Sequence, residues 1–365
     1  MPFINDKLEY LAKQAASHAP IEDAAADRPD DKKFKTRFVF RVDEVMARMR
    51  SRIYGQDKAL ESIENMLKIV RADISDPDKP LFVSLFMGPT GVGKTEIVRV
   101  LSEAIYGHRD NFCRVDMNTL SLDHYAAAIT GSPPGYVGSR EGSTILDKEK
   151  IEGSFSRPGI ILFDEIEKAS PQVIQTLLNI FDNGKMAIAS GEETIDFRNC
   201  LIFMTSNLGA KEVYDYLDRG IFFHIRHFFT LFRSGEYDSV LDQITKKNLE
   251  KTFKPEFINR IDEIITFNRL EKNNLTEIID AYLGQINKRL EKHNCSLQLD
   301  AGAKQFVLDK GFDVRYGARA LKRALRQYVE LPLSDHLIRS GGTGQPYQYV
   351  GYVENNRIRI VQTTA

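Results

Sequence analysis

The sequence predicts an α/β fold: a large domain built on a parallel sheet covered by helices on both faces, followed by a smaller α+β domain. The chain of 365 residues is long enough for two domains. Short, fully apolar runs alternate with helical or glycine-rich stretches, which is typical of parallel strands buried on both faces. From Leu270 the pattern changes to amphipathic helices. The apolar runs are LFVSLFM (81–87), FCRVDM (112–117), GIILFD (159–164), CLIFMTS (200–206) and EIITF (263–267).

The composition is that of a globular protein with no strong attraction to polyanions. Apolar residues make up 42% of the chain, and 50 basic residues face 51 acidic ones, so neither nucleic acid nor an anionic membrane is an expected partner. Cys113, Cys200 and Cys295 lie far apart without metal-ligand spacing, which indicates buried thiols in a reducing compartment. No run is long enough for a transmembrane helix and no signal peptide is recognisable. We therefore expect a cytoplasmic protein.

The chain divides into three parts. Residues 1–37 combine a short amphipathic stretch with a polar segment, and fit either a disordered leader or a docking peptide. Residues 38–268 hold the apolar runs and form the expected large domain. Residues 269–365 form the expected small domain, with short β-like runs after its helices.

One motif predicts a phosphate-binding loop. GPTGVGKT (88–95) fits G-x-x-x-x-G-K-[ST] and stands between an apolar strand and a helical run, the context that a P-loop requires. Gly88, Gly91 and Gly93 let the backbone turn its N–H groups toward phosphates. Lys94 would reach the β- and γ-phosphates, and the Thr95 hydroxyl would ligate Mg²⁺. The whole stretch, including Pro89, Thr90 and Val92, is therefore a predicted site for ATP with Mg²⁺.

Polar residues at the ends of two other strands complete a predicted hydrolytic site. Asp164 ends the strand 159–164 and would hold Mg²⁺ mostly through water, while Glu165 is the natural base for the attacking water. An acidic helix start would look the same. Asn207 would point to the γ-phosphate if its strand lies between the P-loop strand and the Asp164 strand; in isolation it would mean only a turn.

Several motifs in order resemble one family, the AAA+ ATPases of the Clp type, and in particular the second ATPase ring of the ClpA and ClpB unfoldases. The resemblance runs from about Arg52 to about Gln362. It implies a P-loop AAA+ large domain followed by a lid domain, in a chain that looks like an isolated second ring. The motifs are RIYGQ, GPTGVGKT, GSPPGYVG, IILFDEIEKA, the hairpin-like DNGK…DFRN (182–199), MTSNLG, FKPEFINRIDE and YGARALKRA.

The resemblance also implies roles for single residues. Ile53 and Tyr54 match the residues that pack on adenine. Arg260 matches the arginine finger that reaches ATP bound by the neighbouring subunit, which implies a homo-oligomeric ring, six-membered in these relatives. Arg319 matches the small-domain arginine that responds to the nucleotide, although a solvated basic stripe would give the same spacing.

Two segments concern partners. GYVG in SPPGYVGSREGS (132–143) resembles the pore loop that grips polypeptide, with Tyr136 and Val137 as the contacting residues, whereas composition alone fits a surface turn. Residues 219–237 are unusually aromatic, and fit either a helix packed on the core or a docking surface for an adaptor or other partner. No Ile-Gly-Leu or Ile-Gly-Phe tripeptide, the ClpP-type docking signal, occurs there.

Together these features predict an ATP-hydrolysing ring motor that unfolds, disaggregates or remodels proteins by threading them through a pore. The alternative is a nucleotide-switched assembly or docking ATPase that serves a dedicated protein partner without threading. A nucleic-acid motor is disfavoured, because the charge is balanced and the GYVG loop is apolar rather than basic.

Overall fold

The computed structural model describes residues 35–121, 145–188, 194–210, 212, 236–311, 317–340 and 347–364. The chain divides into two compact units. The large unit comprises residues 1–51, 58–87 and 94–266, and the small unit comprises residues 52–57, 88–93 and 267–365. The glycine-rich loop 88–93 therefore groups with the small unit, although the strand before it and the helix after it belong to the large unit.

All five apolar runs of the large unit form strands of one parallel sheet, as the sequence predicts. Their order across the sheet is β2-β3-β6-β1-β7, and each neighbouring pair is parallel. β6 thus lies between the strand that precedes the glycine-rich loop and the strand that ends in Asp164. The strands span Phe82–Met87 (β1), Cys113–Asp116 (β2), Gly159–Asp164 (β3), Cys200–Ser206 (β6) and Glu263–Thr266 (β7).

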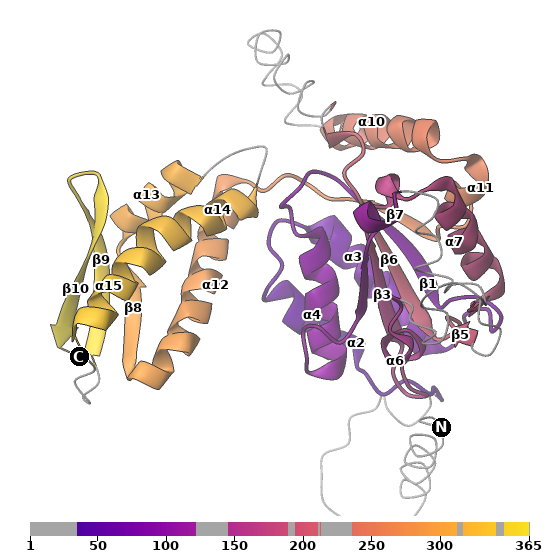
Figure 1. Ribbon diagram of the computed structural model, residues 1–365, viewed down its shortest axis with the longest axis horizontal. Coiled ribbons are helices and arrows are strands. Elements are labelled where there is room, and N and C mark those ends of the chain that lie inside the picture. The colour runs from indigo at the N-terminus through magenta and orange to yellow at the C-terminus, as the bar shows by residue number, and fades with distance from the viewer. Residues whose placement is uncertain are drawn as a thin grey trace, which may run out of the picture. The chain divides into compact units, whose positions relative to one another are not determined.

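Helices cover both faces of this sheet, which confirms the predicted fold class. α3 (Asp57–Ala72) and α4 (Lys94–Tyr106) lie against one face, and α7 (Pro171–Asn183) lies against the other (Figure 1). Successive residues of a strand point to opposite faces. Accordingly, Val83, Leu85 and Met87 of β1 join a buried cluster with α7, and the residues between them face the other layer.

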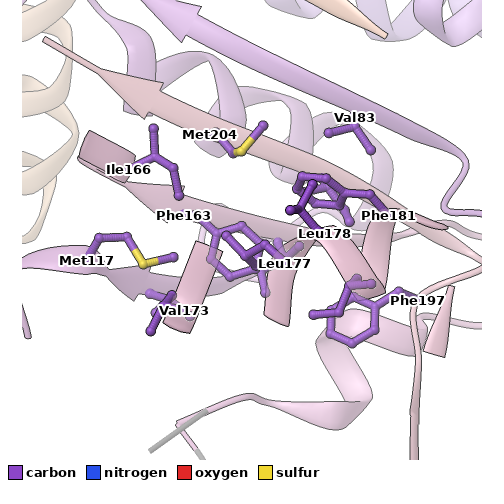
Figure 2. Close-up of a cluster of buried hydrophobic side chains, with 14 of the residues drawn as sticks. Val83, Met117, Phe163, Ile166, Val173, Leu177, Leu178, Phe181, Phe197 and Met204 are labelled. Carbon is purple, nitrogen blue, oxygen red and sulfur yellow. The ribbon is translucent and has the colours of Figure 1, made fainter. Parts of the chain in front are cut away.

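The α7 face forms a dense apolar core. Val173, Leu177 and Phe181 recur every four residues along α7 and pack against Phe163 and Met204 of the sheet (Figure 2). The ends of α7 are set by its sequence. The Ser170 hydroxyl accepts the N–H of Val173, and Gly184 ends the helix at a φ of 60°.

The remaining elements of the large unit are short apart from α10. A hairpin within 182–199 is present as predicted, with β4 paired antiparallel to β5. The elements span Val42–Arg50 (α2), Lys148–Glu152 (α6), Glu236–Thr252 (α10), Pro255–Ile258 (α11), Lys185–Ala187 (β4) and Thr194–Asp196 (β5), with 3₁₀ turns at Met117–Leu120 and Ile166–Lys168.

The C-terminal part of the small unit is a mixed α+β structure, again as predicted. Its sheet has the order β10-β9-β8, with β8 parallel to β9 and β9 antiparallel to β10. Asn355 and Asn356, both at positive φ, form the two-residue turn between β9 and β10. The elements span Lys272–Leu290 (α12), Cys295–Leu299 (β8), Ala301–Gly311 (α13), Ala318–Leu325 (α14), a π-helical Arg326–Glu330, Leu331–Ser340 (α15), Tyr347–Glu354 (β9) and Arg357–Thr364 (β10), with a 3₁₀ turn at Glu291–His293.

Three predicted features lie outside the described residues. They are residues 1–34 of the leader, the pore-loop residues Tyr136 and Val137, and residues 219–235 of the aromatic segment. Among the helices that are described, none is both long and apolar enough to cross a membrane. Cys113, Cys200 and Cys295 are all buried free thiols, as expected from their spacing.

Candidate active site

Lys94, at the start of α4, is held by the residue that directly follows strand β6. Its side chain is buried, with 8% of its surface exposed. The Nζ atom donates to Oδ1 of Asn207, at 2.9 Å. The predicted phosphate-binding lysine and the predicted polar residue after β6 therefore lie in direct contact.

Asp164 ends β3 with both carboxylate oxygens engaged. Oδ1 accepts from the hydroxyl of Thr205, and Oδ2 accepts from the guanidinium of Arg114, at 2.5 Å. Asp164 is 14% exposed and Arg114 is 43% exposed, so the cation covers the carboxylate from the solvent side. The charge of Asp164 is balanced within the chain.

Glu165 has an unusual backbone conformation that fixes its carboxylate. Its φ of 60° and ψ of 55° lie in the left-handed region, which is unfavourable for a residue with a side chain. Its N–H donates to Thr205 Oγ1, at 3.0 Å. The side chain accepts from Asn118 Nδ2 on Oε2, at 2.7 Å, and from Asn207 Nδ2 on Oε1, at 3.2 Å. Two amides thus orient the predicted base.

Asn207 connects the predicted cation to the predicted base. Its Oδ1 accepts from Lys94, its Nδ2 donates to Glu165, and its backbone N–H donates to Oε1 of Glu167, at 3.0 Å. The role predicted for Asn207 requires that its strand lies between the P-loop strand and the strand that ends in Asp164. This requirement is met, because β6 lies between β1 and β3. In an open parallel sheet this edge is where ligands bind.

The backbone of the glycine-rich loop has the conformations that a phosphate cradle needs. Gly88, Gly91 and Gly93 adopt φ values of 138°, 78° and 111°. A Cβ on Gly88 would lie 2.9 Å from the carbonyl oxygen of Phe267. Both this close approach and the positive φ therefore require glycine at position 88. The carbonyl of Gly91 accepts from the N–H of Ala318, at 3.0 Å. Within the small unit, the exposed Arg319 therefore directly follows a residue that contacts this loop.

The predicted adenine-binding pair stands at a buried turn of the small unit. Ile53 is 7% exposed and Tyr54 is half-buried. Burial, and then the nearby carboxylate of Glu277, raise the pKa of Tyr54 above its ordinary value. Gly55 follows at a φ of 67°, and a Cβ there would lie 2.6 Å from the side-chain oxygen of Asn274. A side chain at this position would force the Asn274 side chain to move, and the positive φ would disfavour it as well.

Arg260, the predicted finger, is bound within its own chain. Its Nε donates to both carboxylate oxygens of Asp182, at 2.7 and 2.8 Å, and its NH1 donates to the carbonyl of Glu256, at 2.7 Å. The hydrogen bond from Arg260 lowers the pKa of Asp182. Arg260 remains 27% exposed, so part of the guanidinium still faces solvent.

Sequence reasoning missed four residues that organise these contacts: Arg114, Asn118, Asp182 and Thr205. Arg114 and its neighbours on β2 alternate between exposed and buried positions, a pattern that marks an edge strand but not a partner 50 residues away. Thr205 was visible as a polar residue near the end of an apolar strand. The polar residue can be recognised in the sequence, but its contact with Asp164 can be predicted only when the order of the strands is known.

Comparison with known proteins decides the family. The model of the AAA domain (Cdc48 subfamily) matches residues 79–264. The model of the C-terminal, D2-small domain of ClpB protein matches residues 270–345. The chain belongs to the Clp-type AAA+ ATPases. It resembles the second ring of these proteins, and it is an ATPase of the kind that serves as a Clp chaperone or protease subunit.

Individual relatives agree with this assignment. An ATP-dependent protease ATP-binding subunit-like protein AmiB of Pseudomonas aeruginosa is 45% identical, over 99% of this chain and 100% of its own length. An ATP-dependent protease ATP-binding subunit-like protein of Rhodococcus erythropolis is 35% identical, over 92% of this chain and 91% of its own. The negative regulator of genetic competence ClpC/MecB of Bacillus subtilis is 38% identical, and the match covers 87% of this chain but only 37% of that protein.

Proposed function

We propose that this Clp-type ATPase assembles into a ring that unfolds or remodels polypeptides by drawing them through a central pore. The observation that carries the proposal is the connection from Lys94 through Asn207 to Glu165 at the carboxyl edge of the sheet. One amide contacts both the cation suited to the γ-phosphate and the carboxylate suited to the attacking water. Such an arrangement supports hydrolysis rather than nucleotide binding alone.

Asp164 and Thr95 offer the oxygen ligands of a magnesium–nucleotide site, although Arg114 balances the Asp164 carboxylate in this structure. A carboxylate and the Thr95 hydroxyl, in the first turn of α4, are the oxygen ligands that Mg²⁺ prefers. Across the described ranges no three His, Cys, Asp or Glu side chains converge as metal ligands. The other ligands would therefore be water and nucleotide oxygens, which is how magnesium is usually held. When bound, Mg²⁺ would neutralise charge on the phosphates.

The chain's own groups would divide the chemical work. The ammonium of Lys94 neutralises phosphate charge. Glu165, oriented by Asn118 and Asn207, accepts a proton from the attacking water. Arg319 of the small domain responds to the nucleotide, and Ile53 and Tyr54 pack on the base. The division between large and small domains, after residue 268, is part of this proposal.

Arg260 is proposed to act on ATP bound by the neighbouring subunit, which requires a closed ring, with six members as the expected number. Mixed rings test this directly. Lys94→Ala subunits and Arg260→Ala subunits should each hydrolyse ATP poorly alone. Mixing them should restore part of the activity, because an intact Lys94 site then meets an intact Arg260. Activity that stays at the level of the separate variants would contradict action in trans.

Tyr136 and Val137 are the proposed polypeptide-gripping residues, and the cytoplasm is the proposed compartment. Two relatives are named ATP-binding subunit-like proteins of an ATP-dependent protease, which supports a polypeptide substrate. Residues 219–237 or the leader would receive an adaptor or other partner protein. Neither nucleic acid nor a membrane is proposed as a partner.

The deciding experiment uses Glu165→Gln, which should bind ATP, hydrolyse it slowly and retain bound polypeptide for identification by mass spectrometry. Tyr136→Ala should abolish ATP-dependent unfolding of a fluorescent substrate protein while ATPase activity persists. Tyr352→Ala, at a half-buried position within strand β9 of the small unit, is the matched control. A trapped ring without polypeptide, together with a fully functional Tyr136→Ala, would instead favour the nucleotide-switched docking ATPase.

A further inference from the structure

Gln56, the last residue of the RIYGQ motif, joins three segments that are far apart in sequence. Its side chain is buried, with 2% of its surface exposed. Nε2 donates to the carbonyl of Asn268, at 2.8 Å, and to the carbonyl of Val92, at 3.3 Å. Oε1 accepts the N–H of Asn268, at 2.9 Å. All of these residues belong to the small unit.

The orientation of the Gln56 amide follows from its partners. The N–H of Asn268 requires an oxygen, and the two carbonyls require N–H groups. A rotated amide would set its oxygen against both carbonyls and its NH₂ against an N–H. Both amide hydrogens and one oxygen lone pair are therefore used, which is the satisfied state expected of a buried carboxamide.

The bond to Val92 determines the direction of a neighbouring N–H in the P-loop. In a trans peptide the C=O and the following N–H point in opposite directions, and the described residues contain no cis peptide. With the carbonyl of Val92 directed at Gln56, the N–H of Gly93 is directed to the opposite side of this peptide, away from Gln56. Inward N–H groups are what a P-loop offers to phosphate.

Asn268 and its neighbour Phe267 touch both ends of this loop. Phe267 lies against Gly88 at the start of the loop, where its carbonyl would be 2.9 Å from an added Cβ. Asn268 reaches Val92, near the end of the loop, through Gln56. The backbone between β7 and α12 is thereby linked to the peptide orientation of the phosphate-binding loop.

We infer that Gln56 is a positioning residue for nucleotide binding: it sets the Val92–Gly93 peptide according to the position of the backbone at Asn268. This rests on the proposed ATPase function and extends it to a residue without contact to the reacting atoms. Displacing Asn268 would strain or break the shared amide, and would turn the Gly93 N–H out of the loop. Bound nucleotide and the backbone at Asn268 would then influence each other reciprocally.

The test measures the affinity of the full chain for fluorescently labelled ADP with Mg²⁺. Gln56→Ala leaves two buried carbonyls and one N–H without partners, and should weaken binding on the order of tenfold to a hundredfold. Gln305→Ala is the matched control. It removes an exposed carboxamide that donates to Asp309 on α13 of the same unit, and should leave affinity unchanged.

Gln56→Glu distinguishes a role in positioning the Val92–Gly93 peptide from a general loss of structure. Its carboxylate would face the carbonyls of Val92 and Asn268, so affinity should be low at about pH 8. Burial and these oxygens favour the neutral acid. As the pH falls, the protonated carboxyl can again donate to one carbonyl, so its affinity should recover relative to the wild type. A structural role alone would not produce this pH profile in nucleotide binding.

The outcomes are distinct. A wild-type chain that fails to bind ADP overturns the proposed function itself. A wild type that binds, with Gln56→Ala within about twofold of it and no recovery of Gln56→Glu in acid, overturns the role of Gln56. If Gln56→Ala does not fold, the pH profile of Gln56→Glu decides alone.

Discussion

Asp182 holds the Nε atom of Arg260 with both oxygens of its carboxylate, at 2.7 and 2.8 Å. Asp182 lies in the last turn of α7, and Arg260 follows α11, 78 residues later. Glu256 adds its backbone carbonyl to the same guanidinium. Contacts within its own chain thus orient the guanidinium of Arg260, the predicted finger.

Asp182→Asn should lower the ATPase activity of the assembled protein by about tenfold or more, because Arg260 loses the charge that fixes its orientation. The midpoint of thermal unfolding should hardly change, since both side chains are partly exposed and such pairs add little stability. Asp43→Asn, which breaks the exposed Arg41–Asp43 pair, is the control. Increased activity would show that Asp182 restrains Arg260 instead of presenting it.

Thr205→Val should destabilise the protein by about 1–3 kcal/mol, measured by urea unfolding. The Thr205 side chain is buried, and its hydroxyl serves the backbone N–H of Glu165 and the carboxylate of Asp164 together. Thr205→Ser keeps the hydroxyl and is the control for lost packing. Because Thr205→Val keeps the methyl group, a Thr205→Val variant as stable as the wild type would show that the hydroxyl bonds to Glu165 and Asp164 contribute nothing.

Two glycine substitutions should have opposite effects on thermal stability. Gly284→Ala lies on α12, where an added Cβ would meet nothing within 4 Å among the described residues apart from the backbone of its own helix and its two neighbours in the chain. It should stabilise the protein by roughly 0.5–1 kcal/mol, because alanine favours the helix. At Gly159 a Cβ would lie 1.8 Å from the carbonyl oxygen of Ile151. Gly159→Ala should therefore unfold at a lower temperature or fail to fold, and equal midpoints for the two variants would contradict this packing.

The stability of the protein should fall at alkaline pH, in part through Cys200. Burial raises the pKa of this thiol well above its ordinary value. A group whose pKa is raised by folding stabilises the native state below the unfolded pKa, and this contribution is lost as the pH rises toward the folded pKa. Between about pH 8 and about pH 10, Cys200→Ala should lose less stability than the wild type in urea unfolding. Ile202→Val, in the same strand, should follow the wild type.

The sequence allowed the strands and their parallel direction to be predicted, because five apolar runs separated by helices have few other solutions. It left open which strands are neighbours, and the role of Asn207 depended on that point. The antiparallel pairing of β4 with β5 could also be predicted, from the hairpin-like stretch 182–199.

The missed contacts share a physical cause. Arg114 meets Asp164 across 50 residues, and Asp182 meets Arg260 across 78. Neither pair has a local periodicity, and an exposed arginine on a strand looks like any solvated charge. The grouping of the glycine-rich loop with the small unit was equally hidden, because it arises from Gln56, Phe267 and Ala318 rather than from the loop's own sequence.

The left-handed conformation of Glu165 has a consequence for protein engineering. Glycine or asparagine would adopt this backbone more easily than glutamate does, so either replacement should relieve local strain. The same replacement removes the carboxylate. Because we propose Glu165 as the base, we expect a selection for thermal tolerance alone to drift toward inactive proteins at this position, so a library built to stabilise this chain should keep residue 165 constant.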